Sequence, residues 1–191
     1  MSDPFGPGIA DHKRLVSWLK TQVDLLQQIA QTIADAIAAG HCVYIIGNGG
    51  SAADAQHIAA ELVGQFKRQR RALPAVALTT DTSIILSISN DYGFGQVFAR
   101  QVEALVREGD IVWALSTSGS SPNVIDAVHV ARGVEAKVIG FTGRSGGKLK
   151  PLCHHCLCVD HDTSDRIQEI HQLAYHIICD YVEQRFARPQ I

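Results

Sequence analysis

The sequence predicts a three-layer α/β fold, in which a five-stranded parallel sheet lies between helices and an extra helical segment precedes it. Short apolar runs rich in β-branched residues alternate along the chain with longer segments of helical period. Strands that alternate with helices form parallel sheets through right-handed crossovers. Two of these runs end in a glycine-rich and a serine-rich turn, and open α/β sheets bind ligands at that edge.

The length of 191 residues predicts a single domain, with a helical segment over 1–40 and the α/β core and C-terminal helix over 41–191. A formal charge of −2 gives no overall basic footprint for nucleic acid. The basic run 67–71 is interpreted as a solvated helix end. No signal-peptide pattern and no run of about 18 apolar residues is present. We therefore expect a soluble, cytoplasmic protein that binds neither nucleic acid nor a membrane.

The first predicted helix covers residues 11–39, where apolar residues recur every three or four positions until Gly40 ends the pattern. A helix of this length exceeds what is needed to cover a sheet edge. Part of its apolar surface is therefore expected to pack on another subunit.

The first predicted strand, 42–46, runs into Gly47-Asn48-Gly49-Gly50-Ser51. The glycines permit a tight turn, and Ser51 occupies a position suited to a helix N-cap. Backbone N–H groups at such a helix start can bind an anion. The turn loosely matches a dinucleotide-binding pattern, with Asp81 as its acidic partner, but it lacks the lysine of a P-loop. Glycines that serve turn geometry alone remain an alternative.

In the helix that follows this turn, His57 and Glu61 are four residues apart and lie off the apolar stripe. That spacing places imidazole and carboxylate about 6 Å apart along the axis, close enough to share a metal ion or a substrate atom. The alternative is a solvated face on which the two residues are neighbours by chance.

The second predicted strand is 74–79, and Asp81 can cap a helix running toward Asn90. Residues 90–95 are expected to form a polar turn, and residues 96–107 another helix. The third strand, 111–115, enters Ser116-Thr117-Ser118-Gly119-Ser120-Ser121 before Pro122 opens a helix. Hydroxyl groups around a helix N-terminus suit a phosphate, although a serine-rich surface turn is the simpler alternative.

Residues 137–142 are the fourth predicted strand, and the cysteine-rich segment 153–158 is the fifth. Cys153, Cys156 and Cys158, with His154 and His155, could form a metal tract. No second C-x-x-C pair is present, so a short buried strand is the preferred interpretation. A long helix over 162–186 completes the fold and carries Gln168 and His176 on a polar flank.

The motifs GNGGSAADAQHIAAEL, SNDYGF, ALSTSGSS, TGxxGGK and DRIQEIHxxxxH occur in this order. With them the chain, from about Val23 to its end, resembles the sugar isomerase (SIS) domain family and most closely its bacterial phosphoheptose isomerases. The resemblance implies conversion of sedoheptulose 7-phosphate to D-glycero-D-manno-heptose 7-phosphate, in the biosynthesis of heptose precursors for surface glycans such as lipopolysaccharide. It also implies a homotetramer with active sites at subunit boundaries.

The resemblance also implies roles for individual residues. Glu61 and His176 are the implied acid/base pair, and one zinc ion per subunit is implied on His57, Glu61, Gln168 and His176. The implied substrate-binding residues are Asn48, Gly49, Gly50, Ser51, Glu61, Asn90, Asp91, Ser116, Thr117, Ser118, Ser121 and Gln168. On one regular helix, Gln168 and His176 lie ~12 Å apart along the axis. Either the helix is irregular at its start, or the two residues reach one ion from different subunits.

Four other functions remain open. A non-enzymatic SIS protein that binds the bacterial replication initiator shares the fold but lacks the glutamate and the terminal histidine found here as Glu61 and His176. An isomerase acting on another ketose phosphate would use the same serine loop. A sugar-phosphate-sensing regulatory domain would carry an attached DNA-binding segment, and a dinucleotide enzyme would need a further substrate domain.

Overall fold

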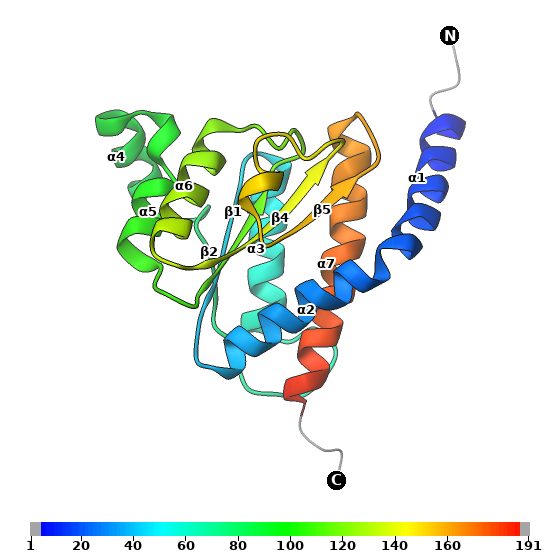
Figure 1. Cartoon of the computed structure of the whole chain (residues 1–191), viewed down its shortest axis with the longest axis horizontal. Coiled ribbons are helices and arrows are strands. Elements are labelled where there is room, and N and C mark those ends of the chain that lie inside the picture. The colour runs from blue at the N-terminus through cyan, green and yellow to red at the C-terminus, as the bar shows by residue number, and fades with distance from the viewer. Residues whose placement is uncertain (1–4, 188–191) are drawn as a thin grey trace.

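The computed structural model describes residues 5–187, so residues 1–4 and 188–191 of the predicted domain lie outside it. Five parallel strands form one sheet in the order β2-β1-β3-β4-β5, which confirms the predicted fold class (Figure 1). The strands are β1 (Val43–Gly47), β2 (Ala75–Ala77), β3 (Ile111–Leu115), β4 (Lys137–Gly143) and β5 (His155–Val159).

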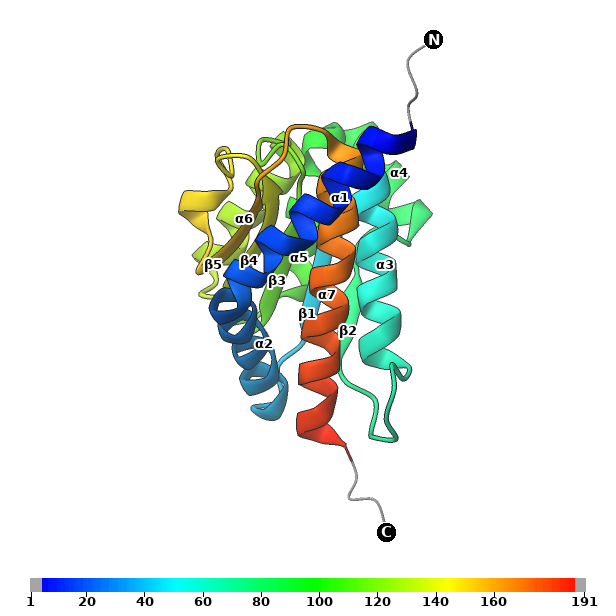
Figure 2. The ribbon, with the colours of Figure 1, turned by 90° about the vertical axis from the view of Figure 1, so that its right-hand side faces the viewer.

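Helices cover both faces of the sheet. They are α1 (Phe5–Leu19), α2 (Val23–Ala38), α3 (Gly50–Val63), α4 (Thr82–Tyr92), α5 (Ala99–Leu105), α6 (Pro122–Gly133) and α7 (Ser164–Phe186), with 3-10 turns η1 (Lys20–Gln22), η2 (Phe94–Gln96) and η3 (Lys150–Leu152). Helices α2, α3 and α7 share a core with one face, and α1 crosses the outside of α7 (Figure 2). Helices α5 and α6 cover the opposite face. No helix of the described part is long and apolar enough to cross a membrane.

The central strand β3 shows why the strands were recognisable as continuous apolar runs. All five of its residues are buried, and they alternate between the two cores, with Trp113 in one and Val112 in the other. A parallel sheet covered on both faces requires apolar residues at successive positions.

The N-terminal segment differs from the predicted single helix over 11–39. Helix α1 already covers Phe5–Leu19, and the ring of Pro7 is tolerated in its first turn, where the missing N–H has no helical partner. The helix then tightens into η1, where the Thr21 hydroxyl donates to the Trp18 carbonyl at 2.7 Å. The predicted helix is therefore two helices, α1 and α2, separated by η1.

The predicted polar turn over 90–95 is also placed differently. Asn90 and Asp91 belong to α4, which continues to Tyr92 and ends where Gly93 adopts a φ of 84°. Asp81 caps this helix as predicted, since its carboxylate accepts from the Ile84 amide at 2.9 Å. The next helix is shorter than the predicted 96–107, because the chain first forms η2.

Candidate active site

The glycine turn after β1 reverses through Gly49, whose φ of 55° lies in the left-handed region that favours glycine. Helix α3 therefore begins at Gly50, and Gly49 occupies the N-cap position predicted for Ser51. The prediction of Ser51 as the N-cap is wrong for this reason. Ser51 is buried in the first turn of α3. This is the N-terminal end of the helix, where the helix dipole favours anions.

The serine loop after β3 gathers hydroxyl groups at the start of α6. Ser121 is the N-cap residue and Pro122 opens the helix, as predicted. The Ser121 hydroxyl does not cap the helix; it lies 3.0 Å from the Ser116 hydroxyl, which is 3.5 Å from that of Ser118. Ser116 is buried, so a group that enters this loop meets preformed hydroxyl partners.

Reciprocal amide hydrogen bonds join the glycine turn to the serine loop. Asn48 Nδ2 donates to Asn123 Oδ1, and Asn123 Nδ2 donates to Asn48 Oδ1, both at 2.9 Å. The connections leaving β1 and β3 diverge here, because β2 and β4 lie on opposite sides of this strand pair. Such a switch point creates the crevice in which open α/β sheets bind ligands.

Two further segments close around this edge. The hydroxyls of Thr117 and Ser164 lie 3.0 Å apart, which brings the start of α7 to the serine loop. Gln168, one turn later, lies against the glycine turn, because a Cβ atom at Gly50 would be 2.7 Å from both its Oε1 and its Nε2. The helix starts of α3, α6 and α7 therefore meet at one edge of the sheet.

His57, Glu61 and His176 form a second cluster, farther along α3 and α7, which run side by side in Figure 2. His57 Nε2 lies 3.0 Å from Glu61 Oε1 and 3.3 Å from His176 Nε2. The imidazole of His176 stacks on Phe66, with ring centroids 5.5 Å apart. The spacing predicted for His57 and Glu61 thus places them together, and α7 adds His176.

The donor set of this cluster suits a metal ion. One ligand atom from each of the three residues lies within 4.8 Å of the others, and residues 5–187 contain no other such group of histidine, cysteine or acidic residues. Burial lowers the pKa of His176, and the neighbouring His57 lowers it further, which favours a neutral imidazole. Two imidazoles and a carboxylate are a known ligand set for catalytic zinc with an open position. The three side chains therefore offer a cation three ligand atoms at one point.

Gln168 is separated from this cluster within one chain. Helix α7 is regular from Ser164 onward, so an irregular start cannot bring Gln168 to His176. Gln168 contacts Gly50, whereas His176 contacts His57, two turns farther along α3.

Asn90 and Asp91 are likewise separate from the cluster. They lie exposed at the end of α4, and the Asn90 amide donates to the Asp91 carboxylate at 2.8 Å. Figure 1 shows α4 at the far left of the molecule, well separated from α7 on the right of the sheet.

The cysteine segment contributes to the half-buried edge strand β5, which holds Cys156 and Cys158 but not Cys153. In the described part of the chain these cysteines do not form a group of three or more close metal ligands. Cys156 and Cys158 project from the same side of the strand, with Sγ atoms 3.6 Å apart. The Cys153 thiol beside Cys156, together with burial, raises the pKa of Cys156 to about 12. A protonated thiol of this kind packs as a small apolar group.

Several residues of the site were not identified from the sequence. Asn123 joins the two turns, and Asp54 and Tyr175 contact each other behind His57. Tyr175 directly precedes His176 and Asp54 lies one turn before His57, so helical spacing offered a signal for both. Spacing alone did not indicate that the two helices would face each other; only the implied zinc ligands His57, Glu61 and His176 pointed to it.

Comparison with known proteins identifies the family. The model of the SIS domain matches residues 9–143. The phosphoheptose isomerase of Roseiflexus sp. (strain RS-1) is 51% identical over 166 residues, which are 87% of this chain and 84% of that protein. Among solved structures, the phosphoheptose isomerase of Neisseria gonorrhoeae has a TM-score of 0.85 and 42% identity, covering 94% of this chain and 95% of that one. That of Francisella tularensis has a TM-score of 0.81 and 36% identity, covering 90% and 97%. The chain therefore belongs to the SIS domain family and, within it, to the phosphoheptose isomerases.

Proposed function

We propose that this protein is an aldose–ketose isomerase that converts sedoheptulose 7-phosphate to D-glycero-D-manno-heptose 7-phosphate for the biosynthesis of heptose precursors. The observation that carries the proposal is the pairing of an anion-binding edge with a Glu61–His176 acid/base cluster in a chain about half identical to a phosphoheptose isomerase. The non-enzymatic SIS protein considered as an alternative lacks the glutamate and the terminal histidine present here as Glu61 and His176.

The phosphate of the substrate binds at the serine loop and the glycine turn. Ser116, Ser118 and Ser121 supply hydroxyl donors, Ser51 lies at the start of α3, and Thr117 lies beside Ser164 at the start of α7. Hydrogen bonds to a charged phosphate are stronger than those between neutral groups, and the helix dipoles add favourable potential. The sugar hydroxyls then contact Asn48, Gly49, Gly50 and Gln168, with Asn90 and Asp91 joining from another part of the assembly.

Isomerisation moves a proton between two adjacent carbons through an enediolate. Glu61 takes the proton from one carbon and returns it to the next, and His176 moves the hydroxyl protons. The two side chains share one cluster, so a single bound substrate reaches both. General acid–base catalysis of this kind contributes ~10²–10⁴-fold to a rate.

A zinc ion fits the cluster, where His57, Glu61 and His176 would hold it. When bound, such an ion stabilises negative charge that develops on the two reacting oxygens. Gln168 lies at the glycine turn of its own chain, so it would join the ion as a ligand only from a neighbouring subunit.

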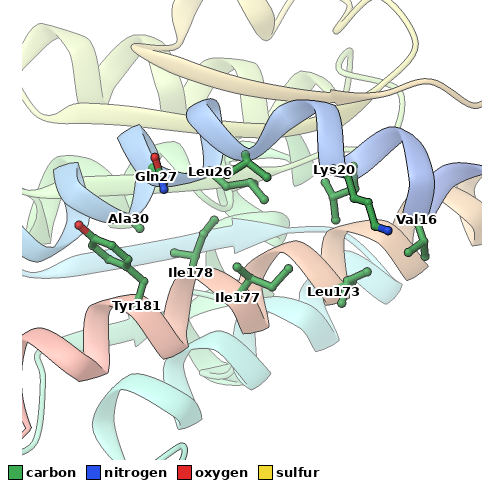
Figure 3. Close-up of a pocket in the computed structure, with 11 residues that line it drawn as sticks. Val16, Lys20, Leu26, Gln27, Ala30, Leu173, Ile177, Ile178 and Tyr181 are labelled. Atoms are coloured by element: carbon green, nitrogen blue, oxygen red, sulfur yellow. The ribbon is translucent and has the colours of Figure 1, made fainter.

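The assembly we propose is a homotetramer with shared active sites. An apolar groove of about 420 Å³ lies between the α1–α2 segment and α7, and Val23, Ile177 and Tyr181 in its lining are exposed (Figure 3). None of the predicted site residues lines this groove. Along α3, Ser51 and Glu61 are ten residues apart, or ~15 Å, and this separation also favours a site completed by a second subunit. Sedimentation velocity at micromolar concentration should give a tetramer; a fully active monomer would contradict the shared site.

A coupled assay over several ketose phosphates tests the activity. Sedoheptulose 7-phosphate should be converted with the highest kcat/KM. Preference for another ketose phosphate would assign the same chemistry to a different substrate. No turnover, together with capture of the replication initiator, would support the non-enzymatic alternative.

A further inference from the structure

Behind the metal-binding cluster, a buried tyrosine and a carboxylate contact the far side of His57. We propose that Tyr175, held by Asp54, is a positioning residue that keeps the proton of His57 on Nδ1 and so leaves Nε2 free to bind the metal ion. The inference rests on the metal site of the proposed function and assigns two residues to its support.

The contacts form a chain from carboxylate to imidazole. The Tyr175 hydroxyl donates to Asp54 Oδ1 at 3.3 Å and lies 3.0 Å from His57 Nδ1. The Tyr175 ring is completely buried, and it meets the His57 ring edge-on, with centroids 5.4 Å apart. Packing of α3 against α7 therefore holds the hydroxyl in one place.

The direction of each hydrogen bond from Asp54 through Tyr175 to His57 follows from the carboxylate at one end of the series. A carboxylate can only accept hydrogen bonds, so the Tyr175 hydroxyl donates its single hydrogen to Asp54. Tyr175 Oη can then act only as an acceptor toward His57, which must donate from Nδ1–H. The neutral imidazole consequently carries its lone pair on Nε2, the atom that faces Glu61 and His176.

Tyr175 is the one hydrogen-bond donor that reaches the Asp54 side chain within residues 5–187, where the second oxygen, Oδ2, is buried without a partner. Burial raises the pKa of Asp54, which the Tyr175 hydrogen bond opposes. A half-buried carboxylate whose buried oxygen has no partner costs stability. A role in orienting His57 gives a reason for its presence.

A competing proton position explains why such support is useful. Glu61 Oε1 lies 3.0 Å from His57 Nε2, so without Tyr175 the imidazole can place its proton on Nε2 and donate it to Glu61. That arrangement occupies two ligand atoms of the metal site at once. Outer hydrogen bonds to ligating histidines commonly change metal affinity by ~10–100-fold.

The test compares zinc affinity and the His57 proton position in three variants. Tyr175→Phe keeps the buried ring and removes the acceptor of His57 Nδ1–H. Asp54→Asn keeps the Tyr175 hydroxyl but removes the negative charge of its acceptor and introduces an amide NH₂, so that the hydroxyl proton is released to turn toward His57 Nδ1. Tyr44→Phe is the matched control, because Tyr44 is a half-buried tyrosine whose hydroxyl donates to the Leu105 carbonyl, outside both the cluster and the apolar groove.

Zinc dissociation constants are measured by competition with a chromophoric chelator. Tyr175→Phe and Asp54→Asn should each weaken zinc binding ~10–100-fold, while Tyr44→Phe stays at the wild-type value. In the zinc-free proteins, at a pH where the imidazole is neutral, ¹⁵N chemical shifts should place the His57 proton on Nδ1 in the wild type and on Nε2 in Asp54→Asn.

The outcomes separate the inference from the proposed function. Wild-type zinc affinity in both Tyr175→Phe and Asp54→Asn would overturn the inference and leave the metal site standing. A wild-type protein that binds no zinc would overturn both. If Tyr175→Phe proves poorly folded by circular dichroism, Asp54→Asn, which leaves the core ring in place, decides the matter through the same two measurements.

Discussion

Replacing Glu183 with glutamine should strongly destabilise the protein, because this buried carboxylate is the shared partner of the loop that follows α3. Its oxygens accept from the backbone amides of Phe66 at 2.9 Å, Lys67 at 2.7 Å and Arg68 at 2.9 Å. Arg70 Nε lies 3.2 Å away, and both side chains of this ion pair are only 1% exposed. The pair ties the segment after α3 to α7.

The expected loss of stability follows from the interactions that the glutamine side chain cannot make. Glutamine keeps the size and one acceptor, but its NH₂ group faces backbone donors and leaves the Arg70 charge uncompensated. Breaking a buried ion pair by removing one partner costs about 3–5 kcal/mol. The three hydrogen bonds from backbone amides are not added to this energy, because they share the same carboxylate as the ion pair.

The Glu183→Gln substitution should also affect the candidate active site, through Arg70. Its Nη2 donates to the backbone carbonyl of Glu61 at 2.6 Å, and its Nη1 donates to the Gly64 carbonyl at 3.0 Å. Loss of the Glu183 charge therefore loosens the end of α3 that carries Glu61. We expect Glu183→Gln to lower catalytic activity at temperatures where the protein is still folded.

Equilibrium urea unfolding measures the effect, at one fixed protomer concentration because subunit association adds to apparent stability. Glu103→Gln is the matched control: its partner Arg100 lies 3.2 Å away in an exposed pair, for which a loss below about 1 kcal/mol is expected. If Glu183→Gln lost no more free energy of unfolding than Glu103→Gln, with unchanged m-values, the buried pair would have no stabilising role.

Three further predictions concern the phosphate site and pH. Ser116→Ala and Ser121→Ala should each weaken sugar-phosphate binding by ~1.5–3 kcal/mol while the fold is kept; unchanged KM and inhibitor affinity in both would remove the phosphate role. Gly119→Ala should raise KM and lower stability by roughly 1–3 kcal/mol, because Gly119 has a φ of 61° and a Cβ atom there would collide with the Gly146 carbonyl; an unchanged KM would contradict this. Burial lowers the pKa of His171 to about 4, so the unfolded chain takes up this proton first and stability should fall by roughly 3 kcal/mol as pH decreases from 6.5 to 4. In His171→Gln this part of the urea-unfolding pH dependence should disappear.

Local periodicity explains most of what was predictable. The strands were evident because a sheet covered on both faces needs continuous apolar runs, as in β3. The pairing of His57 with Glu61 followed from four-residue spacing on one helix. Ser121 and Pro122 marked the start of α6 through the chemistry of helix ends.

The errors arose where one backbone torsion or a distant contact decides the outcome. Gly49 starts α3 before Ser51 because it adopts a positive φ, and a glycine-rich turn offers several residues that could do so. The contact between Asp54 and Tyr175 joins residues 121 positions apart. It depends on how α3 packs beside α7, which no local pattern encodes.

Solvent deuterium exchange at the substrate carbon tests most directly whether Glu61 moves the carbon-bound proton. The measurement uses zinc-replete Glu61→Gln, since glutamine keeps the size of the side chain but cannot take up that proton. Exchange should fall at least ~10²-fold while sugar phosphate still binds. Wild-type exchange in this variant would mean that another residue moves the proton, and would contradict the assignment of Glu61 as the base.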